Sequence, residues 1–209
     1  MARAERTIED RLREEYFDLL PAIRRVAQHL EAEIRYHLLP ISKKLNKYER
    51  LVVTSRVKDC ESAVQKLHRG RGREGATFDS DHPERYSLRS LKDLAGVRVM
   101  AFPPSRLMEI DSILRKIFHW KPDPIKQDGQ MLAFKYHGYC KANRTVRGEY
   151  QIVSMLTGLF WEVEHSAMYK PDPRLRGVAR HVEMSRCRKD VLHALRAFEE
   201  EFEDLLPAR

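Results

Sequence analysis

The stretch from Glu149 to Lys170 constrains the fold more than any other, because its hydrophobic period changes partway along. Its first six residues alternate as a strand does, with Glu149 and Gln151 on one face and Tyr150 on the other. From Met155 onward the apolar residues recur at helical spacing, at Leu156, Leu159, Phe160, Val163 and Ala167, while Glu162 lies on another face. This spacing predicts that Leu156, Leu159, Phe160 and Val163 face the core. A strand that carries a carboxylate and leads into an amphipathic helix is typical of α/β enzymes, which bind ligands at the edge of the sheet.

The rest of the chain also divides into strand and helix patterns. Strand patterns cover residues 51–57, 97–102, 131–142 and 148–154. Helical patterns cover residues 7–39 and 59–68, follow a capping Ser105, and return in a last helix with Val191, Leu195, Phe198, Phe202 and Leu205. We expect the first helix to break at Pro21 and to end near Pro40. We also expect a basic turn through Arg144 and Arg147, and an irregular link or short edge strand at 120–128.

This order of elements favours one α/β domain with helical ends. At 209 residues the chain can bury one good core. The apolar seam of the last helix can pack on the body of the protein or on a second subunit, which would make a homo-oligomer.

The sequence carries a net charge of +8, and the placement of that charge is more informative than its size. Between residues 42 and 73 there are ten lysines and arginines against three acids. This excess suits a polyanionic ligand, and a solvated basic face is the alternative. The acidic segment from Glu199 to Asp204 is interpreted as a solvated face.

The sequence argues against several classes of protein. No apolar run approaches the ~20 residues that a membrane-spanning helix needs, and the N-terminus lacks the apolar core of a signal peptide. The three cysteines are odd in number and widely spaced, which argues against a disulfide framework or a zinc site, so we expect free thiols. We therefore expect a cytoplasmic protein with no membrane partner.

The first candidate binding cluster lies at the end of the first predicted strand, where Arg56 and Lys58 stand. Ser62 and Lys66 follow at intervals of four, which places them on one helical face with Lys58. Arginine can stack on a base or form paired hydrogen bonds with phosphate, and lysine adds a point charge. The group therefore suits a nucleoside triphosphate. A surface role for these side chains is the alternative.

A carboxylate precedes the second predicted strand. Asp93 is followed by Gly96, which permits a tight backbone turn, and by Arg98. Magnesium often uses only one or two protein carboxylates and completes its shell with water and phosphate oxygens, so Asp93 is a candidate ligand. A loop aspartate that caps a turn is the alternative.

A third cluster lies in the third predicted strand. Lys135 is followed by Gly138, which permits close approach to the backbone, and by Tyr139, whose ring can stack on a base. Packing of Tyr139 in the core is the alternative. The glycines between residues 70 and 75 do not form a Walker-type loop, no dinucleotide-binding glycine pattern occurs, and His165 has no second histidine at metalloprotease spacing.

Taken in order, these clusters resemble the synthetase domain of the RelA/SpoT family, the pyrophosphotransferases that make ppGpp. The resemblance covers about residues 51–170. The family's Arg-x-Lys-x-x-x-Ser-x-x-x-Lys is matched by Arg56, Lys58, Ser62 and Lys66, its Asp-x-x-Gly-x-Arg by Asp93, Gly96 and Arg98, and its Lys-x-x-Gly-Tyr by Lys135, Gly138 and Tyr139. Its Glu-x-Gln-Ile, followed by Glu-His and Tyr-Lys, is matched by Glu149, Gln151, Ile152, Glu164, His165, Tyr169 and Lys170.

The resemblance implies a nucleotidyltransferase-like mixed β-sheet flanked by helices, in a single domain with helical extensions at 1–50 and 171–209. It also implies transfer of pyrophosphate from ATP to the ribose 3′-hydroxyl of GDP or GTP with Mg²⁺ as cofactor. By position, Arg56, Lys58, Ser62, Lys66 and Arg98 would bind ATP, Asp93 and Glu149 would bind Mg²⁺ as the catalytic pair, and Lys135, Gly138, Tyr139, Asn143 and Gln151 would bind the acceptor. Glu149 is also the candidate to accept the hydroxyl proton.

The chain departs from the family in the acceptor half. The family's Arg-Ser-x-His after Gly-Tyr is replaced by Cys140, Lys141, Ala142 and Asn143, and Val153 and Phe160 stand where Arg and Trp are usual. The ATP motif is intact. We expect no hydrolase or regulatory region beside the domain, which therefore resembles the small stand-alone alarmone synthetases.

Two alternatives to an alarmone synthetase follow from these departures. One is a toxin-type relative that pyrophosphorylates the 3′ end of tRNA, with a neutralising antitoxin protein as its partner. The basic stretch at 43–73 and the acid-free run at 135–147 would suit an RNA backbone. The other is an inactive nucleotide- or RNA-binding module, against which the presence of both Asp93 and Glu149 argues.

Overall fold

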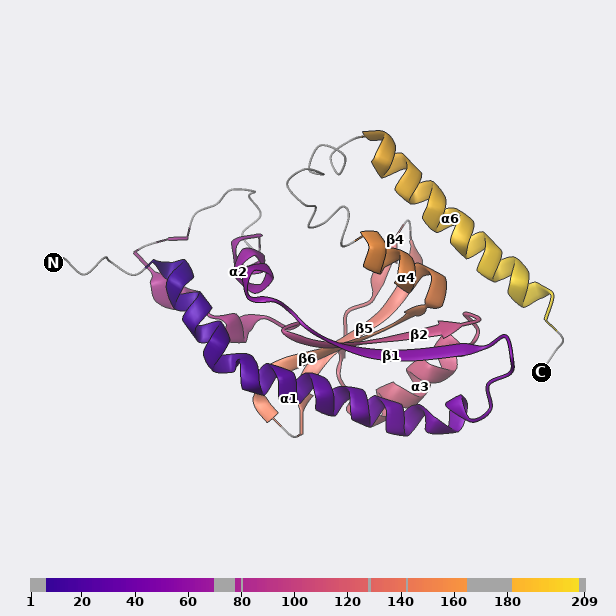
Figure 1. Ribbon diagram of the computed structural model, residues 1–209, viewed down its shortest axis with the longest axis horizontal. Coiled ribbons are helices and arrows are strands. Elements are labelled where there is room, and N and C mark those ends of the chain that lie inside the picture. Colours follow the sequence, from indigo (N-terminus) through magenta and orange to yellow (C-terminus); the bar gives the residue numbers. More distant parts are fainter. Residues whose placement is uncertain are drawn as a thin grey trace.

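The computed structural model describes residues 7–69, 78–79, 81–127, 129–141, 143–164 and 182–206 (Figure 1). The motif residues His165, Tyr169 and Lys170, with Ala142, Ala167 and most of the Arg- and Gly-rich loop at residues 69–75, lie outside these ranges. The helices are α1 (Ile8–Ser42), α2 (Cys60–Arg69), α3 (Arg106–Phe118), α4 (Met155–Glu164) and α6 (Val182–Asp204). The strands are β1 (Arg50–Val57), β2 (Ala95–Phe102), β3 (Lys121–Pro122), β4 (Ile125–Gln127), β5 (Gln130–Cys140) and β6 (Asn143–Ser154).

The strands form one mixed sheet in the order β1-β2-β6-β5-β3, with β4 also paired to β5. β2 and β6 run parallel, and all the other pairs are antiparallel. A parallel pair needs a crossover connection, which here contains α3, β3, β4 and β5. The predicted α/β fold, with a mixed sheet flanked by helices, is confirmed.

Helices α1 and α3 cover one face of the sheet and form the main core with it (Figure 1). The buried side chains of α1 are apolar and recur at spacings of three and four: Leu12, Tyr16, Leu19, Ile23, Val26, Ala27, Leu30, Ile34, Leu38 and Ile41. The sheet contributes Tyr150 and Ile152 to this core, as the strand alternation of β6 predicts. The opposite side chains of the same strand, Glu149 and Gln151, therefore face away from α1.

Helix α1 runs without interruption through Pro21, so the predicted break is wrong. Pro40 also lies inside the helix, which ends two residues later at Ser42. An interior proline costs a helix about 3 kcal/mol, whereas full burial of one large apolar side chain stabilises by about 1.5–3 kcal/mol. Because α1 buries such side chains on both sides of Pro21, packing against the sheet outweighs the local penalty.

Helix α4 packs on the opposite face of the sheet through small residues. Thr157 and Gly158 are buried, and a Cβ at Gly158 would come within 2.7 Å of the sulfur of Met100 on β2. Leu159 and Val163 are exposed, so their predicted place in the core is wrong, whereas Leu156 and Phe160 are half-buried. The close approach at Gly158 decides which side of α4 meets the sheet.

Helix α6 contacts the body with only part of its predicted apolar seam. Phe202 packs on Phe102 and Tyr48, with ring centroids 4.9 and 5.9 Å apart. Val191, Phe198 and Leu205 of the same seam are exposed.

The sequence predicted a solvated face over the acids at the end of α6, whereas two of these acids form hydrogen bonds to other helices. Glu199 is only 2 % exposed and accepts a hydrogen bond from the backbone N–H of Leu156 at 3.3 Å, at the start of α4. Glu203 accepts one from the N–H of Ser105, at the start of α3. The Ser105 side chain makes no capping bond, so its predicted capping role is wrong. Each glutamate provides an acceptor at a helix N-terminus, where backbone N–H groups lack partners.

Among the local predictions, some are confirmed and one is wrong. β3 and β4 confirm the short edge strands between residues 120 and 128. β6 begins at Asn143, so Arg144 and Arg147 lie in that strand and not in a turn. The three cysteines are free, as expected. Within the described ranges, no helix has both the length and the apolar character to cross a membrane.

Candidate active site

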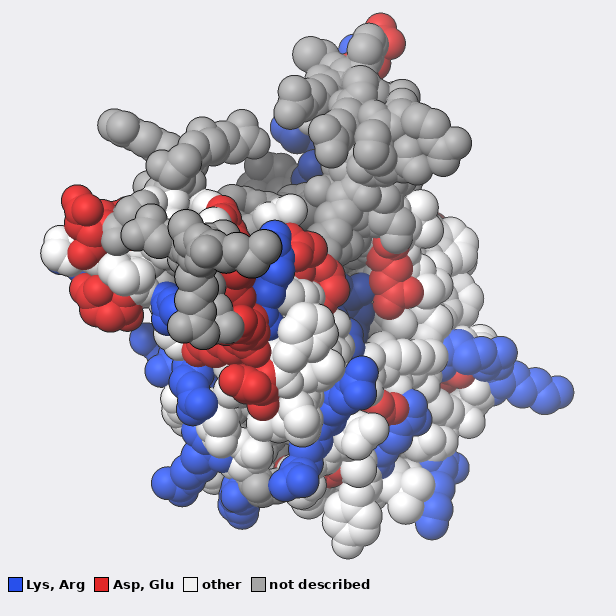
Figure 2. Space-filling view, turned by 60° about the vertical axis from the view of Figure 1, so that its left-hand side comes forward, with Lys and Arg blue, Asp and Glu red and all other residues white. Residues whose placement is uncertain are grey.

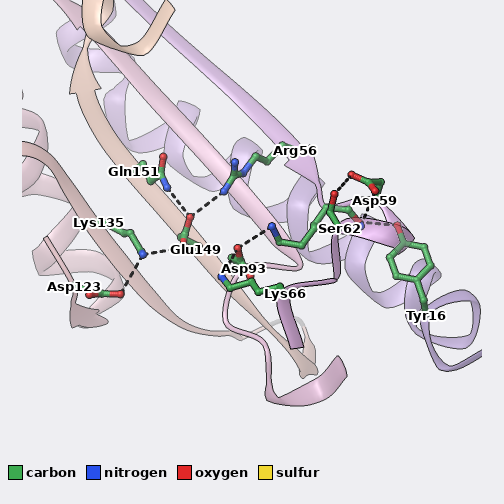
Figure 3. A network of polar contacts seen from close by, with 11 residues as sticks. Tyr16, Arg56, Asp59, Ser62, Lys66, Asp93, Asp123, Lys135, Glu149 and Gln151 are labelled. Carbon is green, nitrogen blue, oxygen red and sulfur yellow. Dashed lines mark hydrogen bonds and ion pairs between the residues drawn. The ribbon is translucent and has the colours of Figure 1, made fainter. Parts of the chain in front are cut away.

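The register of the sheet aligns one row of side chains across the face opposite α1. Arg56 of β1 pairs with Gly96 of β2, Gly96 with Glu149 of β6, and Glu149 with His137 of β5. Because Gly96 has no side chain, Arg56 extends over it toward Glu149 (Figure 3). A Cβ at Gly96 would lie 3.1 Å from Nε of Arg56.

The carboxylate of Glu149 is buried and held by three neighbours. It is 3 % exposed, and its Oε1 accepts a hydrogen bond from Nε2 of Gln151 at 2.8 Å. Nη2 of Arg56 donates to the same oxygen at 3.3 Å, and Nζ of Lys135 lies 3.6 Å from Oε2. A buried carboxylate is stable only when such partners compensate for the lost water.

Asp93 provides a second buried carboxylate, from the turn before β2. It is 6 % exposed, and its Oδ2 lies 3.0 Å from Nζ of Lys58 and 2.7 Å from Nζ of Lys66. Burial would raise the pKa of Asp93, but the charges of the two lysines together hold that pKa below its usual value. Its Oδ1 is buried and has no hydrogen-bond partner within the described residues.

The elements around Asp93 fix the positions of both lysines. The backbone N–H of Lys58 donates to the carbonyl of Leu94 at 2.9 Å, and its carbonyl accepts from the hydroxyl of Tyr16 on α1 at 2.8 Å. Lys66 is carried by α2, which follows Asp59. The core helix α1 therefore holds the end of β1 against the turn that carries Asp93.

Ser62 faces Asp59 in the structure. Its Oγ donates to Oδ2 of Asp59 at 2.6 Å, and its backbone N–H donates to Oδ1 at 2.9 Å (Figure 3). Asp59 thus caps the N-terminus of α2, and Ser62 completes that cap.

Arg98 connects the sheet to α4. Its Nη1 lies 3.4 Å from Oε1 of Glu162 and 3.4 Å from the carbonyl oxygen of Gly158. Burial, followed by the nearby Arg56 charge, lowers the pKa of Arg98. Its Nε is buried without a partner within the described residues.

The five residues predicted to bind the acceptor do not share one environment, and three of them lie near Glu149 or on the same face. Nζ of Lys135 lies 3.2 Å from Asp123 as well as near Glu149, and these acids raise its pKa although burial alone would lower it. Tyr139 is 45 % exposed, and the guanidinium of Arg147 lies 5.4 Å from its ring centroid. Gln151, which was also predicted to bind the acceptor, donates a hydrogen bond to the carboxylate of Glu149.

Gly138 and Asn143 are not brought to this group. A Cβ at Gly138 would lie 2.5 Å from the indole ring of Trp120, which belongs to the core. Asn143 precedes Glu149 by six positions on β6, roughly 20 Å along the strand. Its Oδ1 accepts a hydrogen bond from the N–H of Thr145 at 2.7 Å.

Sequence reasoning missed three residues of the site: His137, Asp123 and Glu162. His137 is 7 % exposed, and its Nδ1 has no hydrogen-bond partner within the described residues. Burial, followed by the charge of Lys92, lowers the pKa of His137. Strand alternation from Lys135 would have placed His137 on the same face. No sequence signal indicated Asp123, and helical spacing placed Glu162 on the polar face of its helix without giving it a role.

The residues present fit a magnesium ion. Magnesium prefers oxygen ligands and needs only one or two protein carboxylates when phosphate oxygens and water supply the rest. The charges of Glu149 and Asp93 both act on Lys135, so the two carboxylates belong to one cluster. Oδ1 of Asp93 is a buried acceptor with no donor within the described residues. No group of three or more His, Cys, Asp or Glu able to hold a metal by itself occurs in the part of the chain that the structure describes.

The basic stretch at 42–73 is divided between two places. Lys43, Lys44 and Lys47 lie between α1 and β1, whereas Lys58 and Lys66 contact Asp93. β1 has eight residues, so roughly 25 Å separates its ends. Figure 2 shows acidic groups among the lysines and arginines on the face it presents.

The mixed sheet, with a long N-terminal helix on one face and a C-terminal helix on the other side, is the fold of the small alarmone synthetases. The small alarmone synthetase 1 from Bacillus subtilis matches with a TM-score of 0.66 and 16 % identity, over 92 % of this chain and 96 % of that one. The same protein bound to its product pppGpp matches with a TM-score of 0.65 and 18 % identity, over 92 % and 96 %.

A GTP pyrophosphokinase family protein from Streptococcus pneumoniae matches with a TM-score of 0.60 and 21 % identity, over 91 % of this chain and 92 % of that one. No protein-family model matches the sequence, and no curated protein matches it significantly. The likeness in three dimensions establishes the fold of the chain.

Proposed function

We propose that the protein is an ATP-dependent pyrophosphotransferase that moves the β,γ-pyrophosphate of ATP to the ribose 3′-hydroxyl of GDP or GTP. The observation that carries this proposal is the pair of buried carboxylates, Asp93 in the turn before β2 and Glu149 on β6. Each is contacted by two cationic side chains. The shared fold with a synthetase solved with pppGpp supports the same conclusion.

The donor nucleotide would bind beside β1 and α2. Lys58, Lys66 and Arg56 lie there, and their charges match a triphosphate. In the structure these cations contact Asp93 and Glu149, so they can exchange a carboxylate for a phosphate group without leaving the site. Arg98, held by α4, adds a further positive charge on the same face.

Glu149 is suited to accept the proton of the acceptor hydroxyl. Its Oε1 already receives hydrogen bonds from Gln151 and Arg56, whereas the contact of Oε2 among the described residues is Lys135 at 3.6 Å. The proton would therefore move to Oε2. Tyr139, exposed on the acceptor side, would stack on the guanine base.

Asp93 and Glu149 would together hold Mg²⁺. Bound there, the ion would supply charge neutralisation for the phosphate oxygens. The lysines and arginines of the site would contribute further neutralisation and would position the two substrates, which is most of what phosphoryl-type transfer requires of a protein.

A transfer assay tests this proposal. The protein is incubated with Mg²⁺ and ATP labelled at the β-phosphate, together with GDP, GTP or deacylated tRNA. We expect label on the guanine nucleotide and, for Glu149→Gln, at least about a hundredfold slower transfer. Label on tRNA alone would show that the acceptor is RNA and not a guanine nucleotide. No transfer to any acceptor by the folded protein would contradict the enzymatic proposal.

A further inference from the structure

His137 is a buried side chain on the site face to which the proposed reaction gives no role. It lies in the same transverse row as Arg56, Gly96 and Glu149. The residue is only 7 % exposed, and its Nδ1 has no hydrogen-bond partner within the described residues. A buried polar atom without a partner is unfavourable, and in a binding site a ligand can supply that partner.

The register places His137 between two groups that would act on the acceptor. Its direct partner on β6 is Glu149, and directly opposed residues have Cβ atoms about 4.5–5.5 Å apart. Tyr139 follows two positions later on β5, roughly 7 Å along the strand. Arg147 stands two positions before Glu149 on β6 and lies over the Tyr139 ring, which puts that ring on the face of Glu149.

This arrangement locates the sugar of the acceptor. A nucleoside whose base stacks on Tyr139 and whose 3′-hydroxyl faces Glu149 carries its ribose over His137. The 2′- and 3′-hydroxyls of ribose are on adjacent carbons and on the same side of the ring. When the 3′-hydroxyl meets Glu149, the 2′-hydroxyl is therefore directed to a neighbouring group.

We propose that His137 binds the 2′-hydroxyl of the acceptor ribose and selects ribonucleotides over 2′-deoxyribonucleotides, an inference that rests on the pyrophosphotransferase activity proposed above. A neutral imidazole has one nitrogen that donates and one that accepts, which matches a hydroxyl group. A site that bonds a hydroxyl rejects the analogue that lacks it, because its own polar atom then stays unpaired.

Paired acceptors and paired variants test this inference. The labelled-ATP assay is run with GDP and with 2′-deoxy-GDP, on the wild type, His137→Phe and His137→Asn. Phenylalanine fills the space without a hydrogen-bonding atom, and asparagine keeps a polar atom near the place of Nδ1. His193→Ala, an exposed histidine of α6, is the control, and melting temperatures establish that each variant is folded.

We expect the wild type and His193→Ala to prefer GDP by about tenfold or more in kcat/KM. His137→Phe should lower this preference to less than about threefold, chiefly by slowing the reaction of GDP, and His137→Asn should keep part of it. Transfer by the wild type with the same preference in His137→Phe would overturn the role of His137 and leave the proposed activity standing. Absence of transfer by the wild type would overturn both.

Discussion

Gly96 leaves the space through which Arg56 reaches Glu149. The two residues at the ends of this contact come from strands separated by β2, so the side chain of Arg56 must pass over the middle strand. A Cβ at this position would lie 3.1 Å from Nε of Arg56, so the arginine side chain would have to shift by a few tenths of an ångström to make room for it.

Gly96→Ala should therefore lower activity while leaving the fold intact. The arginine side chain is flexible and partly exposed, so it can move aside, but it then loses its charge-assisted hydrogen bond with Glu149. Such a bond is worth about 1.5–3 kcal/mol, and we expect kcat/KM for the transfer reaction to fall about tenfold or more.

A double variant identifies the cause of that loss. Arg56→Ala alone should lose at least as much activity as Gly96→Ala, and Gly96→Ala combined with Arg56→Ala should lose no more than Arg56→Ala. Losses that multiply would mean that the added methyl group disturbs something other than Arg56.

Individual site residues differed in how well the sequence predicted them. Asp93, Glu149 and their lysines and arginine were identified by matched motifs, and the structure brings them together. Asp123 could not be predicted, because it contacts Lys135 only through pairing of an edge segment with β5. A contact of this kind depends on sheet register, which local spacing does not encode.

At the scale of elements, α6 is attached to two other helices through their N-termini. Glu199 accepts from Leu156 at the start of α4, and Glu203 accepts from Ser105 at the start of α3. α4 in turn holds Arg98 through Glu162 and Gly158. The C-terminal helix is thus linked to the site face through one intervening helix.

Glu199→Ala should destabilise the protein by about 1–3 kcal/mol, because the half-buried N–H of Leu156 loses its acceptor. The matched control is Glu200→Ala, since Glu200 is the exposed neighbour on the same helix. Urea unfolding followed by circular dichroism measures both. Equal unfolding free energies for the two variants would show that the cap contributes nothing.

The sequence predicted the bounds of the helices and strands more closely than it predicted which side of each faces the core. The described helices and most strands lie within a few residues of their predicted bounds, because hydrophobic periodicity and capping residues mark them. Leu159 and Val163 were assigned to the core, yet the approach of Gly158 to Met100 turns them outward. Pro21 was expected to break a helix that packing keeps whole. In each case tertiary contacts outweighed a local preference.

At the scale of the whole molecule, Glu199 makes the free energy of folding depend on pH. Burial raises the pKa of Glu199 in the folded protein, against the opposing hydrogen bonds from Ser154 and Leu156. A raised folded pKa stabilises most fully below the unfolded value of about 4.3. That contribution is lost as the pH rises through the folded pKa.

Glu199→Gln should remove this dependence, because glutamine keeps an acceptor oxygen and does not ionise. Relative to the wild type, the variant should gain stability between pH 4.5 and pH 7.5, by about 1.4 kcal/mol for each pH unit by which folding raises the pKa. Urea unfolding at both pH values measures the difference. A difference between the two proteins that is the same at both pH values would contradict the prediction.

The transverse row from Arg56 to His137 makes function and folding depend on a single register. In each of these strands one set of side chains lies in the core with α1, and the alternate set forms the site. A slip of one residue in β2 or β6 would exchange the two sets, exposing apolar side chains and burying charged ones. Single-residue insertions and deletions in these strands would therefore destabilise the fold itself. Substitutions on the site face, in contrast, leave the core side chains unchanged. Under the proposed function, the chain can change its acceptor by substitution while its architecture stays constant.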